Sequence, residues 1–256
     1  MSPQLQITAL DGIPLINSGD DLAVVINAAL ARNDLTLQSG DILVLAQKIV
    51  SKAEGRIVDL NTVNPGPEAC DLAAQVDKDP RLVELILSES SAVVRAKTGV
   101  LITEHRLGWI MANAGIDASN VNGDGLVLLL PLDSDLTCRH LRAALQQHWQ
   151  VDVGVIINDS FGRPWRLGTT GVALGAAGVP SLWDRCGETD LFGRELKATH
   201  QAIADELAAA ASLLQGQGAE GRPVVLIRGL DLAPGIEIPA QPAATLLRDK
   251  SADLFR

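Results

Sequence analysis

Val153-Gly154-Val155-Ile156-Ile157 is an apolar run that ends at the polar residues Asn158-Asp159-Ser160, and this pattern predicts a buried strand. A second apolar run, Ile42-Leu43-Val44-Leu45-Ala46, predicts another buried strand and leads into Gln47-Lys48. Sheets commonly present functional groups to ligands just beyond the ends of their strands. We therefore expect Asp159 to face a ligand.

Further helices and strands surround these two runs. Apolar residues at helical spacing predict helices at 22–30, 69–76, 82–86 and 195–214, and Gly216 is placed to close the last one. Short strands are expected over 93–132, including 126–130, and another at 224–228, whereas the glycine-dense segment 162–178 is assigned no element. Strands and helices mix without strict alternation, which predicts an α+β fold with mixed sheets.

One unit, residues 1–256, is expected to span the chain, because no repeat or low-complexity linker interrupts it. An internal boundary between two lobes would lie either in the turn at 88–99 or near Gly123. The tail after about residue 235 is expected to be flexible.

Composition excludes several classes of function. Acidic residues outnumber basic ones 31 to 21, aromatic residues make up 3%, and tyrosine is absent. A net charge of -10 disfavours nucleic acids and acidic membranes as partners, because a basic surface supplies most of the affinity for both. No apolar run is long enough to span a bilayer.

The three cysteines, Cys70, Cys138 and Cys186, are far apart and form no CxxC pair. They fit neither a disulfide framework nor a zinc site, and we interpret them as small buried apolar residues. The N-terminus lacks the pattern of a signal peptide, so the cytoplasm is the expected location. The four histidines show no ligand spacing and are left out of the candidate site.

The segment Gly216-Gln217-Gly218-Ala219-Glu220-Gly221 matches the letters GxGxxG. Its context differs from a dinucleotide fingerprint, because a predicted helix precedes it and a predicted strand follows it. A glycine-rich loop can still present backbone N–H groups to phosphate oxygens. A simple helix stop and turn is the alternative.

Two polar segments carry groups suited to phosphate chemistry. Asp159 and Ser160 offer oxygen ligands for a hard cation, and Arg163 and Arg166 offer forked donors for oxyanions. The segment 113–120 adds Asp117 as a second carboxylate and Asn120 as a hydrogen-bonding group. Capped turns with surface salt bridges use the same residue types and remain an alternative for both segments.

Three cations, Lys48, Lys52 and Arg56, follow the strand at 42–46. In an acidic chain such a cluster is suited to a polyanion, although a solvated amphipathic edge has the same pattern. No GxSxG motif and no recognisable cysteine nucleophile is present, so covalent catalysis has no support.

Together these segments resemble the coenzyme F420-0:L-glutamate ligase family. The resemblance covers roughly residues 10 to 230 and rests on seven segments: Gly12-Ile13-Pro14, IVSKAEGR at 49–56, NAGIDASN at 113–120, DSFGRPWR at 159–166, GETDLFGREL at 187–196, ADEL at 204–207, and 216–223. It implies a stand-alone, two-lobed α+β ligase that forms an intertwined homodimer and lacks the nitroreductase-like domain of some relatives.

The resemblance also implies roles for individual residues. Asp117 and Asp159 would hold one Mg²⁺ or Mn²⁺, Ser160 and Gln217 would serve a second, and K⁺ is a further candidate cation. Asp117, Asp159 and Lys52 are the expected catalytic residues, and Arg163, Arg166 and Arg194 are expected partners for substrate carboxylates and the phosphodiester. GTP would contact Gly12, Ile13, Pro14, Leu15, Gln47, Lys48, Lys52, Asn120, Gly216, Gln217, Gly218, Ala219, Glu220, Gly221, Arg222 and Pro223.

The implied reaction joins L-glutamate to coenzyme F420-0 and then adds γ-linked glutamates. Because oxide is a poor leaving group, the acid would first accept the γ-phosphoryl group of GTP and form an acyl phosphate. Two alternatives remain: a related nucleotide-dependent amide ligase acting on another small carboxylate, and a non-catalytic protein that binds a nucleotide or a deazaflavin.

Overall fold

A five-stranded sheet forms the centre of the computed structural model, which describes residues 3–232 and 238–253. Its strand order is β1-β12-β2-β8-β9, with bounds β1 Gln6–Ala9, β12 Val224–Arg228, β2 Ile42–Ala46, β8 Gly154–Arg163 and β9 Arg166–Ala177. Neighbouring strands are antiparallel except for β2 and β8, which run parallel. The α+β prediction with mixed sheets is therefore confirmed.

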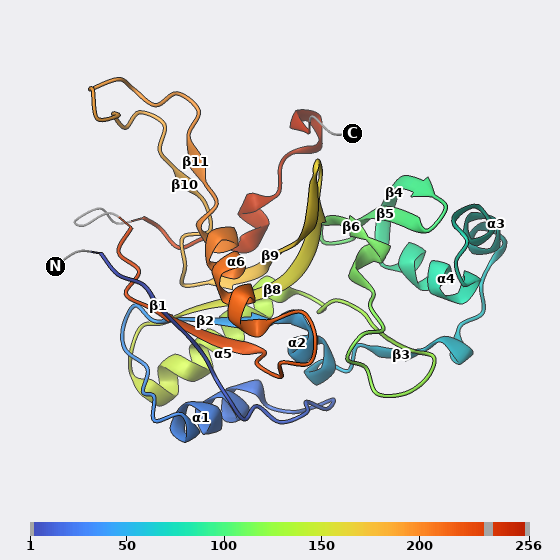
Figure 1. Cartoon of the computed structure of the whole chain (residues 1–256), viewed down its shortest axis with the longest axis horizontal. Coiled ribbons are helices and arrows are strands. Elements are labelled where there is room, and N and C mark those ends of the chain that lie inside the picture. The colour runs from blue at the N-terminus through green and yellow to red at the C-terminus, as the bar shows by residue number, and fades with distance from the viewer. Residues whose placement is uncertain (1–2, 233–237, 254–256) are drawn as a thin grey trace.

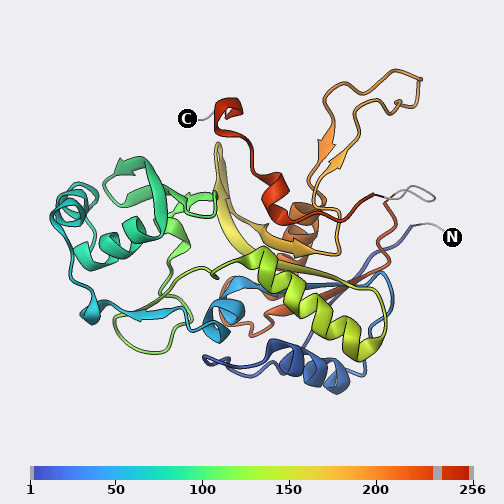
Figure 2. The ribbon, with the colours of Figure 1, turned by 180° about the vertical axis from the view of Figure 1, so that it is seen from behind.

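Helices cover both faces of this sheet. Helix α6 (Ile203–Gln215) packs on one face, while α5 (Ser134–Trp149) packs on the other together with α1 (Leu22–Arg32), as the two opposite views show (Figures 1 and 2). The short helix α2 (Gln47–Ala53) begins where β2 ends. Fully buried aliphatic side chains of the central strands, such as Leu43, Leu45 and Ile156, form the core between these layers.

Residues 57–129 form a second group of elements at one end of the long axis (right in Figure 1). It pairs β3 (Ile57–Asp59) with β7 (Leu126–Leu128) and places α3 and α4 beside the sheet β4-β5-β6. This group has a hydrophobic cluster of its own, which includes Val76, Val83 and Leu101. The remaining bounds are α3 Pro67–Val76, α4 Pro80–Ser88, β4 Ser90–Lys97, β5 Val100–His105 and β6 Ile110–Ala112.

A short pair of strands, β10 (Trp183–Asp184) and β11 (His200–Gln201), stands at the base of an extended arm formed by residues 185–199. The arm projects away from the central sheet (Figure 1). Short 3₁₀ helices occur at Leu60–Thr62, Asn113–Gly115, Ala243–Leu246 and Lys250–Ala252. The predicted flexible tail includes residues 233–237 and 254–256, which lie outside the described residues, whereas Ala243 is buried in the main core.

Local signals account for most of the predicted elements. Asp21 accepts hydrogen bonds from two backbone N–H groups at the start of α1, and Pro80 occupies the first turn of α4, where its missing N–H costs nothing. The predicted helices at 22–30, 69–76 and 82–86 and the strands at 42–46 and 224–228 are confirmed, and the strand at 126–130 ends at 128.

The hairpin β8-β9 corrects two expectations. The strand does not end at Ile157 but continues to Arg163, and the glycine-dense segment is the long strand β9. Its glycines allow helices to approach closely: a Cβ atom on Gly171 would lie 2.3 Å from the Ala208 oxygen in α6, and one on Gly175 would lie 2.4 Å from the Ser134 oxygen in α5.

A β-bulge explains how these two glycines serve opposite faces. Positions four residues apart on a regular strand share one face. The register shifts between Ile157 and Asn158, which pair with Gly175 and Ala173 respectively, so one residue of β9 is extra and the faces exchange. Each glycine therefore meets a different helix.

Two helices also differ from expectation. The helix predicted to begin near residue 195 begins at Ile203, because the preceding residues form one side of the arm and β11 pairs with β10. Its apolar face and its closure by Gly216, which has a φ of 75°, are as predicted. Residues 134–149, to which no element was assigned, form α5, with Asp133 capping its first turn.

We predict that Gly171→Ala lowers the free energy of unfolding by about 1–3 kcal/mol, because the new methyl group pushes against the backbone of α6. Gly162→Ala in the same hairpin is the matched control, since no atom would lie within 4 Å of its Cβ, and its effect should stay below about 0.5 kcal/mol. Urea unfolding measures both, and equal effects would contradict the close-packing argument.

Candidate active site

A cavity of about 990 Å³ lies at the ends of β2 and β8. Four segments that are distant in sequence contribute to its walls: residues 13–16, the start of α2, residues 115–120, and the loop after α6. The second half of β8, from Asn158 to Arg163, forms a further wall. The cavity thus collects the polar segments that the sequence singles out.

The parallel pairing of β2 with β8 brings two of these segments together. Ala46 pairs with Asn158, so Gln47 and Lys48 leave one strand where Asp159 and Ser160 continue the other. Lys48 Nζ forms an ion pair with Asp117 Oδ2, which adds the third segment. Asp117 is itself fixed by a β-bridge to Leu128. One lysine and two carboxylates therefore face the same space.

The pKa values of Asp117 and Asp159 are shifted in opposite directions. Burial alone would raise the pKa of Asp117, but hydrogen bonds from Lys48 and Ser119 outweigh it and hold the pKa below its usual value. Burial raises the pKa of Asp159 to about 6, and the negative charge of Asp117 adds to this rise. Lys52 has a lowered pKa because of burial and the nearby charge of Lys48. Ionised Asp159 is thus the least compensated charge of the three.

The glycine-rich loop after α6 closes the cavity from another side. Gln217 Nε2 donates a hydrogen bond of 2.8 Å to Ser160 Oγ, and Asn120 Nδ2 donates one of 3.3 Å to the Gly218 carbonyl. Lys52 Nζ donates to the Asn120 carbonyl at 2.7 Å. Since α6 precedes the loop and β12 follows it, the argument against a dinucleotide fingerprint holds.

Most of the predicted site residues line this cavity. They are Ile13, Pro14, Leu15, Gln47, Lys48, Lys52, Asp117, Asn120, Asp159, Ser160, Arg163, Gly216, Gln217, Gly218, Ala219, Gly221, Arg222 and Pro223. Gly12, Glu220, Arg166 and Arg194 do not line it in a single chain. The Gly12 carbonyl accepts a hydrogen bond from Arg32, Glu220 accepts one from the Gly218 N–H, and Arg194 lies on the arm over the ring of Phe192.

Sequence reasoning missed several lining residues, of which Asn158 is the most informative. Its Nδ2 donates to the Ala208 carbonyl and to Gln215 Oε1, while its buried Oδ1 has no hydrogen-bond partner among the described residues. A polar residue at the end of an apolar strand was the available signal. Phe161 and Met111 also line the cavity, but nothing in their local pattern distinguishes them from core residues.

The donor atoms of the cavity fit a hard divalent cation. Asp117, Asp159, Ser160 and Gln217 can offer only oxygen ligands, which Mg²⁺ and Mn²⁺ prefer. Burial is the main cause of the raised pKa of Asp159, and the charge of Asp117 adds a smaller rise. Among the described residues, no histidine lines the cavity.

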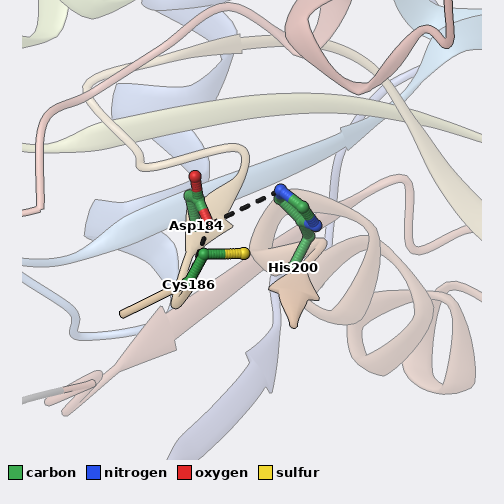
Figure 3. Close-up of side chains that lie close together, drawn as sticks. All are labelled: Asp184, Cys186 and His200. Carbon is green, nitrogen blue, oxygen red and sulfur yellow. Dashed lines mark hydrogen bonds and ion pairs between the residues drawn. The ribbon is translucent and has the colours of Figure 1, made fainter. Parts of the chain in front are cut away.

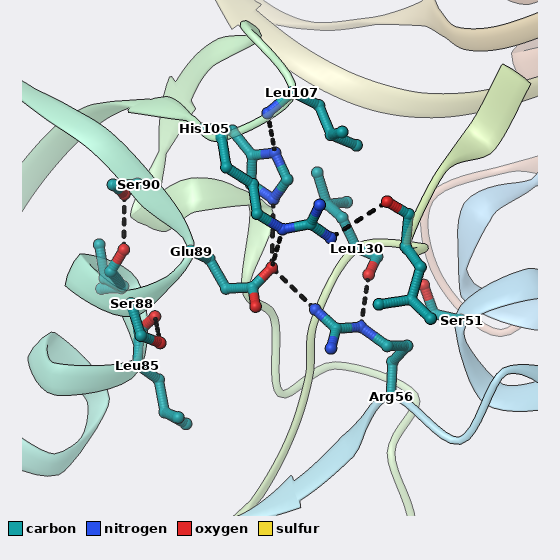
Figure 4. A network of polar contacts seen from close by, with 12 residues as sticks. Ser51, Arg56, Leu85, Ser88, Glu89, Ser90, His105, Leu107 and Leu130 are labelled. Carbon is teal, nitrogen blue, oxygen red and sulfur yellow. Dashed lines mark hydrogen bonds and ion pairs between the residues drawn. The ribbon is translucent and has the colours of Figure 1, made fainter.

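Arg56, the third predicted cation, has a different place. Its guanidinium bonds Glu89 Oε2 at 2.7 Å and the Leu130 carbonyl at 3.0 Å (Figure 4). Glu89 also pairs with Arg106 and lies 3.4 Å from His105 Nε2, and these partners bring its pKa down to about 2 although burial opposes this. The network joins the segment after α2 to the end of α4 and the end of β5, and Arg56 does not line the cavity.

We predict a pH-dependent stability effect of Asp159→Asn. A carboxyl group whose pKa is raised from 3.8 to about 6 holds its proton more tightly in the folded state, so its ionisation destabilises the fold as pH rises through this range. As the pH rises from about 4 to about 7, the free energy of unfolding of the variant should therefore increase by about 1–3 kcal/mol relative to that of the original chain.

Urea unfolding at several pH values measures this gain in the absence of metal. Asp124→Asn is the matched control, because it removes an exposed carboxylate that does not line the cavity. If the difference in free energy of unfolding between Asp159→Asn and the original chain stays constant with pH, the argument that burial disfavours ionised Asp159 is wrong.

Comparison with known proteins identifies the family. Residues 12–229 match the family described as F420-0:Gamma-glutamyl ligase. Proteins named coenzyme F420:L-glutamate ligase are 46% identical in Methanothermobacter thermautotrophicus (98% of this chain, 99% of the relative) and 46% identical in Methanopyrus kandleri (96% and 97%). The relative of the same name in Methanocaldococcus jannaschii is 39% identical (95% and 94%). In the described part of the chain, no helix is long and apolar enough to cross a membrane. The chain belongs to the F420-0:gamma-glutamyl ligase family of enzymes.

Proposed function

We propose that the protein joins L-glutamate to coenzyme F420-0 in a GTP-dependent reaction and then adds γ-linked glutamates. The names of its relatives support the substrates. The observation that carries the proposal is the convergence of Lys48, Lys52, Asp117, Asp159 and the loop 216–223 on one cavity. Phosphoryl transfer needs such a set, because it is catalysed mainly by positioning and by neutralising charge.

Two kinds of group would hold the nucleotide. The backbone N–H groups of the loop 216–223 and the ammonium groups of Lys48 and Lys52 are suited to phosphate oxygens. Asp117 and Asp159 would hold one Mg²⁺ or Mn²⁺, and Ser160 and Gln217 would serve a second. Bound there, such ions neutralise charge on the phosphates during transfer.

The chain's own residues would then organise two steps. In the first step, the carboxylate of F420-0 attacks the γ-phosphorus of GTP, GDP leaves, and an acyl phosphate forms. In the second step, the amine of glutamate attacks the acyl carbon and phosphate leaves with the bonding electrons. Arg163, which lines the cavity, is the proposed partner for a substrate carboxylate or the phosphodiester. Lys52 adds positive potential beside the phosphates.

We further propose a two-lobed, intertwined homodimer that works in the cytoplasm. The exposed side chains Leu191 and Phe192 on the arm are the kind of surface that a second chain would cover. Free cysteines suit a reducing compartment. Arg166 and Arg194, which do not line the cavity of their own chain, stay candidates for substrate contacts in such a dimer.

We predict that Asp159→Asn lowers the rate of glutamylation by about 100-fold or more, because it removes a carboxylate proposed to hold the metal. The assay supplies F420-0, L-glutamate, GTP and Mn²⁺ or Mg²⁺ with and without K⁺, and mass spectrometry counts the glutamates added. Asp124→Asn, which changes the charge equally, should keep full activity.

Other outcomes would decide between the alternatives. Near-normal turnover of Asp159→Asn would overturn the metal assignment. A product formed only from another small carboxylate would indicate a related amide ligase. Binding of GTP without any release of phosphate would indicate a binding protein that lacks the chemistry.

A further inference from the structure

The base of the arm carries a cluster of ligand-type side chains that is separate from the cavity. Asp184, Cys186 and His200 each offer one ligand atom, and these atoms all lie within 4.8 Å of one another. Asp184 Oδ1 lies 3.5 Å from His200 Nε2. Figure 3 shows the three side chains turned toward one another. None of them lines the cavity.

Strand geometry explains why these side chains meet. Asp184 pairs directly with His200 across the antiparallel strands β10 and β11, and opposite residues of such a pair share one face. Cys186 lies in the turn just after β10, and its Sγ is within 4.8 Å of the other two ligand atoms. The Cys186 N–H donates a 2.9 Å hydrogen bond to Asp184 Oδ1, which orients the carboxylate beside the thiol.

The arginine between Asp184 and Cys186 has partners of its own. Arg185, between the two ligand residues, stacks over Trp183 at 4.5 Å and forms an ion pair of 2.8 Å with Glu188. Its charge is therefore engaged away from the cluster. All three candidate ligands are exposed to solvent, so an ion can reach them without rearrangement of the core.

We propose that Asp184, Cys186 and His200 bind a zinc ion that links β10 to β11 at the base of the arm. A thiolate, an imidazole and a carboxylate are all zinc ligands, and three of them leave one position for water. Two ligand atoms on tetrahedral zinc lie about 3.3–3.7 Å apart, so the 3.5 Å between Asp184 Oδ1 and His200 Nε2 already fits. The oxygen ligands offered by Asp117, Asp159, Ser160 and Gln217 suit a different class of metal.

Co²⁺ is the appropriate probe, because a tetrahedral thiolate site gives a sulfur-to-cobalt charge-transfer band that an oxygen site cannot give. The full-length protein, reduced and treated with a chelator, should bind one equivalent of Co²⁺ with this band, and Zn²⁺ should displace it. Cys186→Ser should abolish the band. Asp184→Asn and His200→Asn should each weaken binding by about tenfold or more.

Cys70→Ser is the matched control, because Cys70 is the other exposed cysteine, and the band should be unchanged in this variant. Absence of the band in the unchanged chain, its loss in Cys70→Ser, or unchanged affinity in His200→Asn would each overturn the proposal. Cys186→Ser should keep ligase activity, so failure of the zinc site and failure of the proposed function give different results.

Discussion

The parallel pairing of β2 with β8 is the constraint on which the site depends. Parallel strands end at the same edge of a sheet, so the residues that follow them emerge side by side. Here the register sets Ala46 against Asn158, and the next residues are Gln47-Lys48 on one strand and Asp159-Ser160 on the other. A slip of one residue would turn Asp159 to the opposite face and remove it from the cavity.

Close packing of α6 supplies the next wall. The absence of a side chain at Gly171 lets the helix backbone rest against β9. Gly216 stops the helix, and the loop that follows reaches Ser160 through Gln217. The β-bulge opposite Asn158 matters for the same reason, because it lets β9 present Gly175 to α5 without withdrawing Gly171 from α6.

The sequence predicts what local patterns encode. Apolar runs predicted β2 and the buried part of β8, and apolar residues at helical spacing predicted α1, α3 and α4. Resemblance to a family then named most of the residues that line the cavity. The length of the hairpin β8-β9 was not predictable in this way, because two of its glycines, Gly171 and Gly175, are explained by helices that are distant along the chain.

The predictions for cysteine and histidine show the same limit of reasoning from local sequence patterns. Cys138 is buried, as expected for a small apolar residue, but Cys70 and Cys186 are exposed, and that expectation was wrong for them. Spacing along the chain could not connect Cys186 with His200, because the arm separates them and only the pairing of β10 with β11 brings them together. A search for ligand spacing finds local motifs and misses clusters built by strand register.

The charges of the cavity are the reason why we propose a metal–nucleotide complex as its ligand rather than either component alone. Lys48 compensates Asp117, whereas Asp159 keeps a raised pKa, so a cation is needed to stabilise both carboxylates when ionised. A triphosphate alone would meet these carboxylates and be repelled, and a metal ion alone would meet two lysines, Lys48 and Lys52. The complex supplies positive charge to the aspartates and negative charge to the lysines at once. This pairing of opposite requirements within one cavity is the physical reason to expect a nucleotide-dependent ligase rather than a simple binder of anions or cations.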